Sequence, residues 1–281
     1  MSRYKTHGEH AAFGGTLGYY EHDSRETKTP MRFAVYQPPQ AAGGKCPALY
    51  YLAGLTCTEE TFVTKGGALG LAAELGLVLV APDTSPRGAK VPGESDSWDF
   101  GLGAGFYVDA TQAPWDENYR MYSYVTEELF DLVSASFPVD TARVGIFGHS
   151  MGGHGALVMG LRAPDKYRSV SAFAPVAAPM QSPWGKKAFG NYLGPDEAAW
   201  RAYDASVLVT EHRHPGTLLV DQGLADKFMM DQLYTEAFLE ACKAAGQKAE
   251  VRMHERYDHS YFFISTFMGD HLRHHAAALG R

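Results

Sequence analysis

The sequence contains little cysteine and no long apolar run. Three cysteines among 281 residues, Cys46, Cys57 and Cys242, are an odd number without CxxC spacing, so neither a disulfide framework nor a structural zinc site is indicated. No stretch approaches the roughly 20 apolar residues that cross a bilayer, and the opening MSRYKTHGEH has no apolar core of the kind that secretory signals carry. We therefore expect a cytoplasmic protein with no membrane partner.

Positive charge is also scarce. Lysine and arginine number 25 against 32 aspartates and glutamates, which gives a formal net charge of -7 and a pI near 5.9. A nucleic-acid-binding surface needs clustered cations, and the sequence has no basic run of that kind, so we expect no nucleic-acid partner. Hydrophobic residues make up 45% of the chain and no linker-like segment divides it, so residues 1–281 are predicted to form one domain.

Apolar runs of strand length recur along the chain. Residues 16–23 and 31–37, joined by a short polar connection, predict a hairpin. Six further runs begin at Ala48, Leu77, Arg143, Ser169, Thr217 and Ala249. Helix-like stretches follow most of them, and continuous apolar strands separated by helices are typical of parallel pairing, because a parallel sheet is covered on both faces. The pattern predicts an α/β fold with a mostly parallel, eight-stranded sheet and helices on both faces.

Three stretches between the predicted strands stand out. Residues 119–137 form the clearest predicted helix, with apolar residues at helical spacing and Pro138 to end it. Segments 83–115 and 179–205 are rich in Gly, Pro, Trp and Tyr and are expected to be irregular, and loops of that length are usually functional. In open α/β sheets ligands bind beyond the carboxyl ends of the strands, so residues just after each strand are the first candidates for a site.

Gly148, Ser150 and Gly152 form a G-x-S-x-G pattern where a predicted strand meets a helix-like run. The pattern is weak on its own, but this position is typical of the nucleophile elbow of the α/β-hydrolase fold, where glycine on either side allows strand and helix to approach closely. Ser150 would stand at the electropositive N-terminal end of the helix, where developing negative charge is stabilised. We predict Ser150 as the nucleophile of a serine hydrolase.

An acid and a histidine follow in the chain order that this fold uses. Asp226 lies in a short loop after the strand that begins at Thr217, and Asp221, still within that strand, is the alternative acid. Asp226 could instead cap the next helix, and one carboxylate is not expected to do both. His259 follows the last strand and can accept the proton of Ser150 as general base. We predict Ser150, Asp226 and His259 as the catalytic triad.

Backbone N–H groups after the third strand and after the nucleophile are expected to form the oxyanion hole. They belong to Leu55 and Met151. Cys57 could be read as a second nucleophile, but it lacks an elbow and a base, so a small apolar filler beside the site is favoured.

The other histidines give weaker signals. His254 alternates with its neighbours inside the last strand, which favours a structural role. His212 and His214 lie in a polar loop, and His271, His274 and His275 fall on a C-terminal helix. The spacing of the last three could bind a metal, but no carboxylate or cysteine stands at ligand spacing, so a solvated helix face is favoured.

Longer segments of the sequence closely resemble the S-formylglutathione hydrolases, the esterase D type thioesterases of formaldehyde detoxification. The resemblance runs through nearly the whole chain and is carried by GLTCTEETF from Gly54, APDTSPRG from Ala81, SWDFGLGAGFYVDAT from Ser97, PWDENYRMYSYVTEEL from Pro114, FGHSMGGHGAL from Phe147, SAFAPV from Ser171, PWGKKAF from Pro183, DQGLADKF from Asp221 and YDHSYFFI from Tyr257. Two departures are visible: Arg256 stands where the family usually has Gly, which bears on the turn of the histidine loop, and the segment after Phe228 is slightly shorter.

The resemblance implies hydrolysis of S-formylglutathione to glutathione and formate without a metal or organic cofactor, and it implies that a homodimer is common. The residues that it matches to the family's site are the triad Ser150, Asp226 and His259, the oxyanion donors Leu55 and Met151, and Cys57 near the nucleophile.

The resemblance also implies that Trp98, Phe106 and Trp184 line the acyl and thiol pockets, although packing in the core or in loops is an equal alternative for each. Glutathione is anionic, so cations are expected at the mouth of the cleft. The candidates are Lys65, Arg87, Lys186 and Lys187. Three other functions stay open on the sequence: a general short-chain carboxylesterase, an acyltransferase whose acceptor is not water, and a non-catalytic binding protein, of which the last would be expected to lack a triad member.

Overall fold

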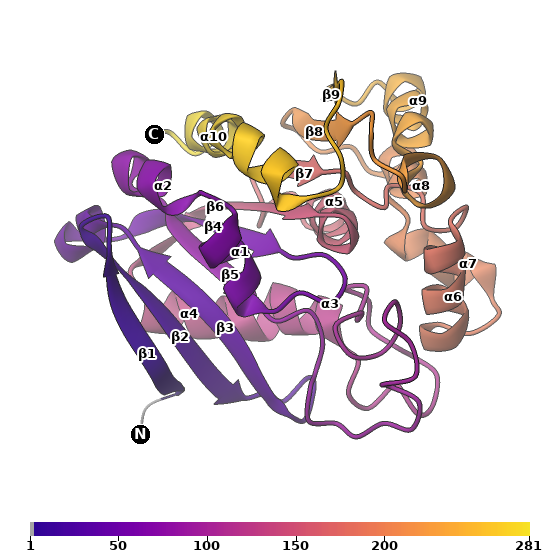
Figure 1. The fold of residues 1–281 in the computed structure, drawn as a ribbon, viewed down its shortest axis with the longest axis horizontal. Helices are drawn as coiled ribbons and strands as arrows, with labels where there is room; N and C mark the ends of the chain where they lie inside the picture. The colour runs from indigo at the N-terminus through magenta and orange to yellow at the C-terminus, as the bar shows by residue number, and fades with distance from the viewer. Residues whose placement is uncertain (1–2) are drawn as a thin grey trace.

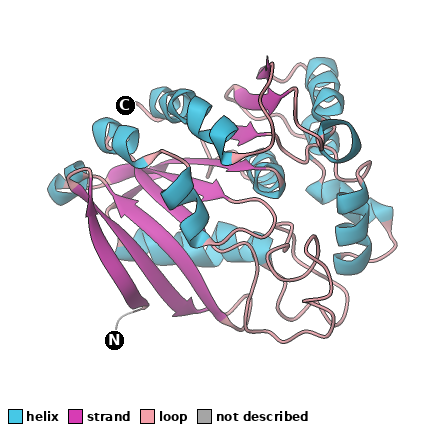
Figure 2. Cartoon of the chain, viewed as in Figure 1, coloured by secondary structure: helices cyan, strands magenta, loops and turns pink. Residues whose placement is uncertain are grey.

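A sheet of nine strands runs through the centre of the computed structural model, which describes residues 3–281 (Figure 1 and Figure 2). The strands are β1 (Lys5–Ala12), β2 (Gly15–Asp23), β3 (Pro30–Gln37), β4 (Cys46–Leu52), β5 (Val78–Pro82), β6 (Val139–His149), β7 (Ser169–Phe173), β8 (Leu218–Gly223) and β9 (Ala249–His254). Their order across the sheet is β1-β2-β3-β5-β4-β6-β7-β8-β9.

Eight of these strands coincide with the predicted runs. β2 pairs antiparallel with β3, β3 pairs antiparallel with β5, and the six strands from β4 to β9 are parallel to one another. Every residue of β4, β5, β7 and β8 is buried, because helices cover both faces of this part of the sheet. The predicted hairpin, the parallel pairing and the α/β class are confirmed.

The predicted count of eight strands is wrong by one, because it omits β1 at the edge of the sheet. Six of the eight residues of β1 are exposed, and its sequence KTHGEHAA shows no alternation of apolar and polar residues. Backbone pairing with β2 holds the strand in place. A strand that buries no apolar face leaves no hydrophobic period in the sequence.

Helices cover both faces of the sheet. They are α1 (Glu59–Lys65), α2 (Leu69–Leu75), α3 (Met121–Ser123), α4 (Phe130–Ser136), α5 (Met151–Arg162), α6 (Pro183–Tyr192), α7 (Glu197–Trp200), α8 (Ala205–Glu211), α9 (Thr235–Ala245) and α10 (Tyr261–Ala278). α1, α2 and α10 lie on one face, and α4 and α5, with α8 packed against α5, lie on the other (Figure 1).

The helix predicted over 119–137 is confirmed: α3 and α4 are joined by a π-helical stretch, Tyr124–Leu129, and α4 ends before Pro138. Segment 83–115 contains no helix, as expected. Segment 179–205 was expected to be irregular, and this is wrong, because it contains α6 and α7. The start of α6 carries two ordinary signals, Pro183 at its first position and the side chain of Ser182, which accepts the N–H of Gly185 at 2.9 Å.

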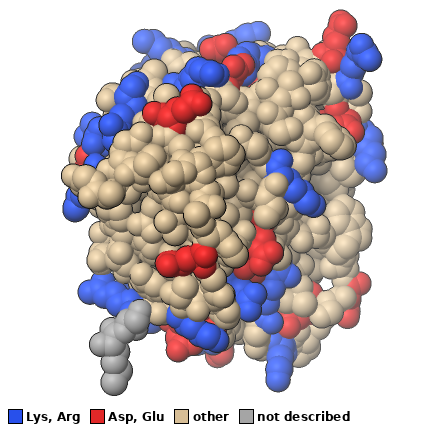
Figure 3. Space-filling model, turned by 60° about the vertical axis from the view of Figure 1, so that its left-hand side comes forward, with Lys and Arg blue, Asp and Glu red and all other residues tan. Residues whose placement is uncertain are grey.

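The length of the helices and the charge of the surface bear on whether the protein can have a membrane or nucleic-acid partner. None of the helices within residues 3–281 is long and apolar enough to cross a bilayer. On the face drawn in Figure 3, acidic and basic side chains are interspersed around an area without charged groups, and they form no continuous basic patch there. This face therefore has no surface suited to a phosphate backbone.

Candidate active site

Ser150 stands in a sharp turn between the carboxyl end of β6 and the start of α5. Its backbone has φ 57° and ψ -119°, a strained conformation of the kind expected at a nucleophile elbow. A Cβ on Gly148 would lie 2.3 Å from the carbonyl oxygen of Gly152, and a Cβ on Gly152 would lie 1.9 Å from the carbonyl oxygen of Leu52. Strand and helix thus approach so closely that only glycine fits at both positions.

The two N–H groups expected to form an oxyanion hole lie beside Ser150. Met151 is the first residue of α5, and N–H groups in the first turn of a helix have no partner within it. Leu55 lies in the loop after β4, and a Cβ on the preceding Gly54 would be 3.2 Å from the Cβ of Ser150. In the described part of the chain, the N–H of Leu55 donates to no backbone carbonyl. Both groups are available as donors near the nucleophile.

Asp226 and His259 are brought together from two loops. Oδ2 of Asp226 lies 2.5 Å from Nδ1 of His259, which leaves Nε2 of the imidazole as a proton acceptor. The other oxygen, Oδ1, accepts the N–H of Phe228 at 2.9 Å. This bond closes a turn and does not cap the next helix, whose N-cap is Phe228 and has no side-chain cap bond, so the alternative role of Asp226 as a helix cap does not apply.

The loops that carry these two residues are joined by backbone hydrogen bonds. The N–H of Leu224 donates to the carbonyl of His254, and the N–H of Ala225 donates to the carbonyl of Tyr257, both at 2.9 Å. Arg256, which stands where the family usually has Gly, has φ 69° and so adopts the left-handed conformation that glycine takes easily. The histidine loop keeps a glycine-type turn in spite of the substitution.

Asp221, the alternative acid, is committed elsewhere. Its two oxygens each accept a hydrogen bond from Arg252 at 2.6 Å, and Nε2 of His254 and of His271 lies 3.3 Å from it. The carboxylate is fully buried. His254 also stacks on Phe267 with ring centroids 3.8 Å apart, so the structural role predicted for His254 is confirmed.

The histidines of α10 do not form the solvated face that was expected. His271 and His275 are fully buried against the sheet, where Nδ1 of His271 bonds to Ser171 at 2.8 Å and His275 bonds to both Ser169 and Ser171. Burial lowers the pKa of both imidazoles, so they are neutral. Within residues 3–281, no group of three or more His, Cys, Asp or Glu side chains is placed to hold a metal ion.

A hollow of about 220 Å³ opens at Ser150, and we call it the Ser150 cavity. Its lining comprises Gly54, Leu55, Cys57, Trp98, His149, Ser150, Trp184, Phe228, His259, Ser260 and Tyr261. Asp226 lies behind His259 and is almost fully buried. Four of the residues proposed from sequence to bind substrate or oxyanion therefore reach the cavity, namely Leu55, Cys57, Trp98 and Trp184.

Aromatic rings form one wall of the Ser150 cavity. The ring centroid of Phe228 lies 5.1 Å from that of His259 and 4.8 Å from that of Trp184, which in turn contacts Trp98 edge to face. Trp98 is 57% exposed and marks the rim. Phe228 was not singled out from the sequence. Its position two residues beyond Asp226 is the only signal that could have indicated it.

Phe106 is the one predicted pocket residue that does not line the Ser150 cavity. Its side chain is fully buried, and its carbonyl oxygen lies 2.9 Å from Nε2 of His154. Core packing, the alternative weighed for it, describes this position better.

His149, the variable position of the G-x-S-x-G pattern, is a cavity residue that sequence reasoning missed. Its ring centroid lies 4.4 Å from that of His259. Burial, and then the charge that His259 carries when protonated, hold the pKa of His149 well below its usual value. His149 therefore stays neutral beside His259 and does not compete for the proton.

Cys57 is half-buried in the lining of the Ser150 cavity, and burial raises the pKa of its thiol. A thiol that resists ionisation is a poor nucleophile, so the structure favours the interpretation of Cys57 as a filler.

The cations expected at the mouth of the cleft are absent from the lining of the Ser150 cavity. Lys187 forms an ion pair with Asp99 at 2.5 Å, next to Trp98, and Arg87 forms one with Asp83 at 2.6 Å. Both are held by acidic partners rather than presented to the cavity.

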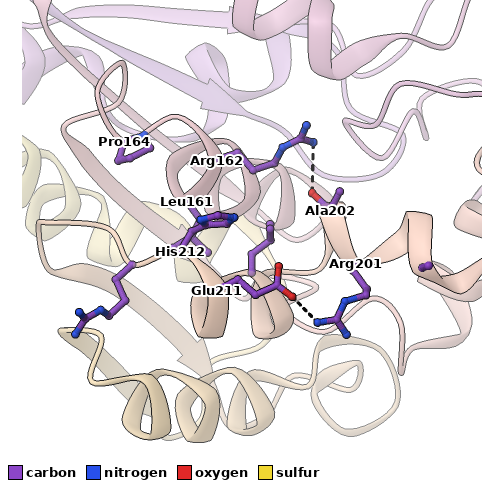
Figure 4. A pocket seen from close by; sticks show the side chains of 10 residues that line it. Leu161, Arg162, Pro164, Arg201, Ala202, Glu211 and His212 are labelled. Atoms are coloured by element: carbon purple, nitrogen blue, oxygen red, sulfur yellow. Dashed lines mark hydrogen bonds and ion pairs between the residues drawn. The ribbon is translucent and has the colours of Figure 1, made fainter.

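A larger hollow, of about 850 Å³, lies near α5, α7 and α8 (Figure 4). Two of its three arginines are already engaged: Arg162 lies 4.1 Å over the ring of Tyr122 and donates to the carbonyl of Ala202, and Arg201 pairs with Glu211. None of its lining residues is a Ser, Thr or Cys. This hollow therefore contains no hydroxyl or thiol that could act as a nucleophile.

Comparison with known proteins agrees with this geometry. Residues 24–274 match the sequence model of the family described as "Putative esterase". The chain is 58% identical over 269 residues to the S-formylglutathione hydrolase of Rattus norvegicus, with 95% of each chain covered. It is 52% identical over 277 residues to the S-formylglutathione hydrolase of Paracoccus denitrificans, with 99% of each covered.

A solved structure is equally similar. An S-formylglutathione hydrolase from Agrobacterium tumefaciens superposes with a TM-score of 0.96 at 52% sequence identity, over 98% of this chain and 100% of that one. The match extends through segments 83–115 and 179–205 as well as the sheet. The chain belongs to the esterase family of the α/β-hydrolase fold, and within it to the S-formylglutathione hydrolases.

Proposed function

We propose that this protein is a serine thioesterase that hydrolyses S-formylglutathione to glutathione and formate through an acyl-enzyme on Ser150. The observation that carries the proposal is the convergence at one cavity of a strained serine, a histidine bonded to a buried carboxylate, and two uncommitted N–H groups. Relatives of that name, matched nearly end to end, support the choice of substrate.

Acylation uses each of these groups once. Nε2 of His259 takes the proton of Ser150 as Oγ attacks the formyl carbon, and the carbonyl oxygen becomes an anion that the N–H groups of Leu55 and Met151 stabilise. Collapse of the tetrahedral adduct breaks the carbon–sulfur bond. Glutathione leaves as the thiol, with the proton from His259.

Deacylation repeats the sequence with water. A water molecule gives a proton to His259 and attacks the formyl ester, and collapse of the second adduct releases formate and returns the proton to Ser150. Asp226 keeps Nδ1 of the imidazole as the donor nitrogen and stabilises the imidazolium formed in both halves.

The size of the cavity favours a small acyl group. Phe228 packs against His259, and Trp184 packs against Phe228, so a longer acyl chain would overlap with their rings. A pocket rejects larger groups by such overlap better than it rejects smaller ones, since each missing methylene is worth only about 1–3 kcal/mol.

Replacing the nucleophile tests the proposal. We expect Ser150→Ala to lower kcat on S-formylglutathione by at least about a thousandfold, because no acyl-enzyme can form. Ser265→Ala, an exposed serine on α10, is the matched control and is expected to retain wild-type turnover. Near-normal turnover by Ser150→Ala would refute the assignment.

A short-chain carboxylesterase is the second candidate, and one observation favours it: the lining of the Ser150 cavity includes no Lys or Arg that would recognise an anionic thiol. Comparing kcat/KM for S-formylglutathione with that for 4-nitrophenyl acetate separates the two. We expect the thioester to be preferred by at least tenfold, and a preference for the acetate would favour the esterase.

A cytoplasmic location, a homodimer and a single domain over residues 1–281 stay predictions. Sedimentation at two protein concentrations would measure the oligomeric state.

A further inference from the structure

The loop of residues 54–57, which carries the N–H of Leu55, contains a strained residue. Thr56 has φ 67°, in the left-handed region that β-branched side chains rarely adopt. Its side chain is exposed, so packing does not hold it there. A conformation of this kind persists only where neighbouring groups over-determine the backbone. We call residues 54–57 the oxyanion loop.

Groups from segment 83–115 hold the oxyanion loop on both sides of Thr56. The N–H of Thr56 donates to the carbonyl of Gly103 at 2.9 Å. The carbonyl of Cys57 accepts two hydrogen bonds, from Oγ1 of Thr84 at 2.6 Å and from Nη2 of Arg87 at 3.0 Å. The peptide group before the strained residue and the one after Cys57 are therefore fixed from outside the loop, while the N–H of Cys57 donates within the loop to the carbonyl of Gly54 at 3.3 Å.

Arg87 is itself held in one orientation. Its Nε donates to Oδ2 of Asp83 at 2.6 Å and its Nη2 donates to Oδ1 at 2.9 Å, so the same Nη2 bridges Asp83 and the carbonyl of Cys57. Asp83 is buried, and it also accepts the N–H of Thr84 at 2.6 Å. A paired, planar guanidinium is a rigid donor, which a flexible lysine is not.

The geometry points to Arg87 as a positioning residue for the oxyanion hole: through Asp83 and the carbonyl of Cys57 it keeps the oxyanion loop in the strained turn that aims the N–H of Leu55. The inference rests on the proposed function in that it takes Leu55 as an oxyanion donor. Arg87 is not among the residues that line the Ser150 cavity, so its contribution is expected where the anion forms rather than where the substrate binds.

Arg87→Ala tests this against a matched control. Without the bridge the loop can relax, so we expect kcat to fall roughly 10- to 100-fold while KM changes by less than about threefold. The expected loss in kcat is smaller than the roughly 100- to 1,000-fold loss that follows when an oxyanion donor is deleted outright. Arg143→Ala removes an arginine of similar exposure, paired with Asp140 at 2.7 Å far from the site, and is expected to leave kcat unchanged. Arg87→Lys is expected to fall between wild type and Arg87→Ala.

A second substitution separates positioning from a general structural role. Asn adopts the left-handed conformation far more readily than Thr, so Thr56→Asn lowers the strain of the turn even when the hydrogen bonds of Arg87 are absent. We expect Arg87→Ala to cost at least threefold less in kcat when Thr56 is Asn. If the loss is the same in both backgrounds, or if KM rises and kcat does not fall, the inference is overturned.

Each variant is assayed with S-formylglutathione and with 4-nitrophenyl acetate, and its Tm is recorded. The kcat loss is expected with both substrates, so a wrong substrate in the proposed function leaves this test intact. If Arg87→Ala fails to fold, Arg87→Lys decides: kcat within twofold of the Arg143→Ala control would overturn the inference.

Discussion

The nucleophile elbow and the oxyanion loop meet in the Ser150 cavity, yet they are held in different ways. The elbow is fixed by backbone contacts that its own glycines permit, at Gly148 and Gly152. The oxyanion loop is fixed by groups of a later segment, namely the carbonyl of Gly103 and the side chains of Thr84 and Arg87, and the pairing of Arg87 with Asp83 depends on charge. The sequence pattern of such an elbow is therefore contained in five consecutive residues, and we expect that its glycines cannot be replaced. The loop can be weakened in steps.

The largest effect is expected at the elbow, from Gly152→Ala. The added Cβ would lie 1.9 Å from the carbonyl oxygen of Leu52, which is backbone and cannot move aside without disturbing β4. We expect a loss of at least about 3 kcal/mol in the free energy of unfolding, measured by urea denaturation, together with loss of activity. Gly43→Ala is the control, because no atom lies within 4 Å of the position that its Cβ would take, and little change is expected. A Gly152→Ala protein as stable as wild type would show that the elbow is not close-packed.

The oxyanion loop leads into α1, whose first residue gives the second prediction. Burial, and then the negative charge of Asp83, raise the pKa of Glu59 to about 6. A carboxyl group whose pKa is raised on folding destabilises the protein as pH increases from about 4.5 to about 6, because the folded state must then give up a proton that it holds more tightly. Glu59→Gln removes this cost. We expect the variant to be more stable than wild type by up to about 2 kcal/mol at pH 8.

The pH dependence of that gain checks its cause. The difference in unfolding free energy between Glu59→Gln and wild type is expected to shrink as pH falls from about 6 to about 4.5 and to vanish below that. Glu240→Gln, which changes an exposed glutamate on α9, is the matched control and is expected to leave the unfolding free energy nearly unchanged. A gain that is independent of pH would mean that packing, and not ionisation, separates the two proteins.

The smallest effect is expected from Arg256→Gly, at a left-handed position that carries no chemistry. Here φ is 69° and the side chain is exposed, so glycine removes a strain of roughly 1–2 kcal/mol and loses little contact. We expect a gain of about 1 kcal/mol, or about 2–4 °C in Tm, with kcat unchanged. Arg256→Ala keeps the strain, so an equal gain from alanine would assign the effect to the side chain instead of the backbone.

The same contrast explains what could be predicted from the sequence. The central strands carry continuous apolar runs because both of their faces are covered, and the residues expected after β4, β6, β8 and β9 do meet at one edge of the sheet. β1 was not predicted because its stability comes from backbone pairing, which leaves no pattern of side chains in the sequence.

Other features depend on contacts between distant residues. Whether His271 faces solvent or the sheet depends on how α10 docks, and its burial is compensated by Ser171, 100 residues away in the chain. The role of Arg87 depends on a carbonyl 30 residues earlier. Neither pairing leaves a period or a motif in the sequence.

The two oxygens of the Asp226 carboxylate have different partners, and this limits how the substrate range of the enzyme can be altered. One oxygen orients the base and the other fixes the backbone at Phe228, whose ring bounds the space for the acyl group. Any redesign that shifts the main chain at residue 228 to admit a bulkier acyl group will therefore also move the support of the imidazole. Selectivity and turnover cannot be tuned separately from that side, and an engineer would do better to begin at the exposed rim around Trp98.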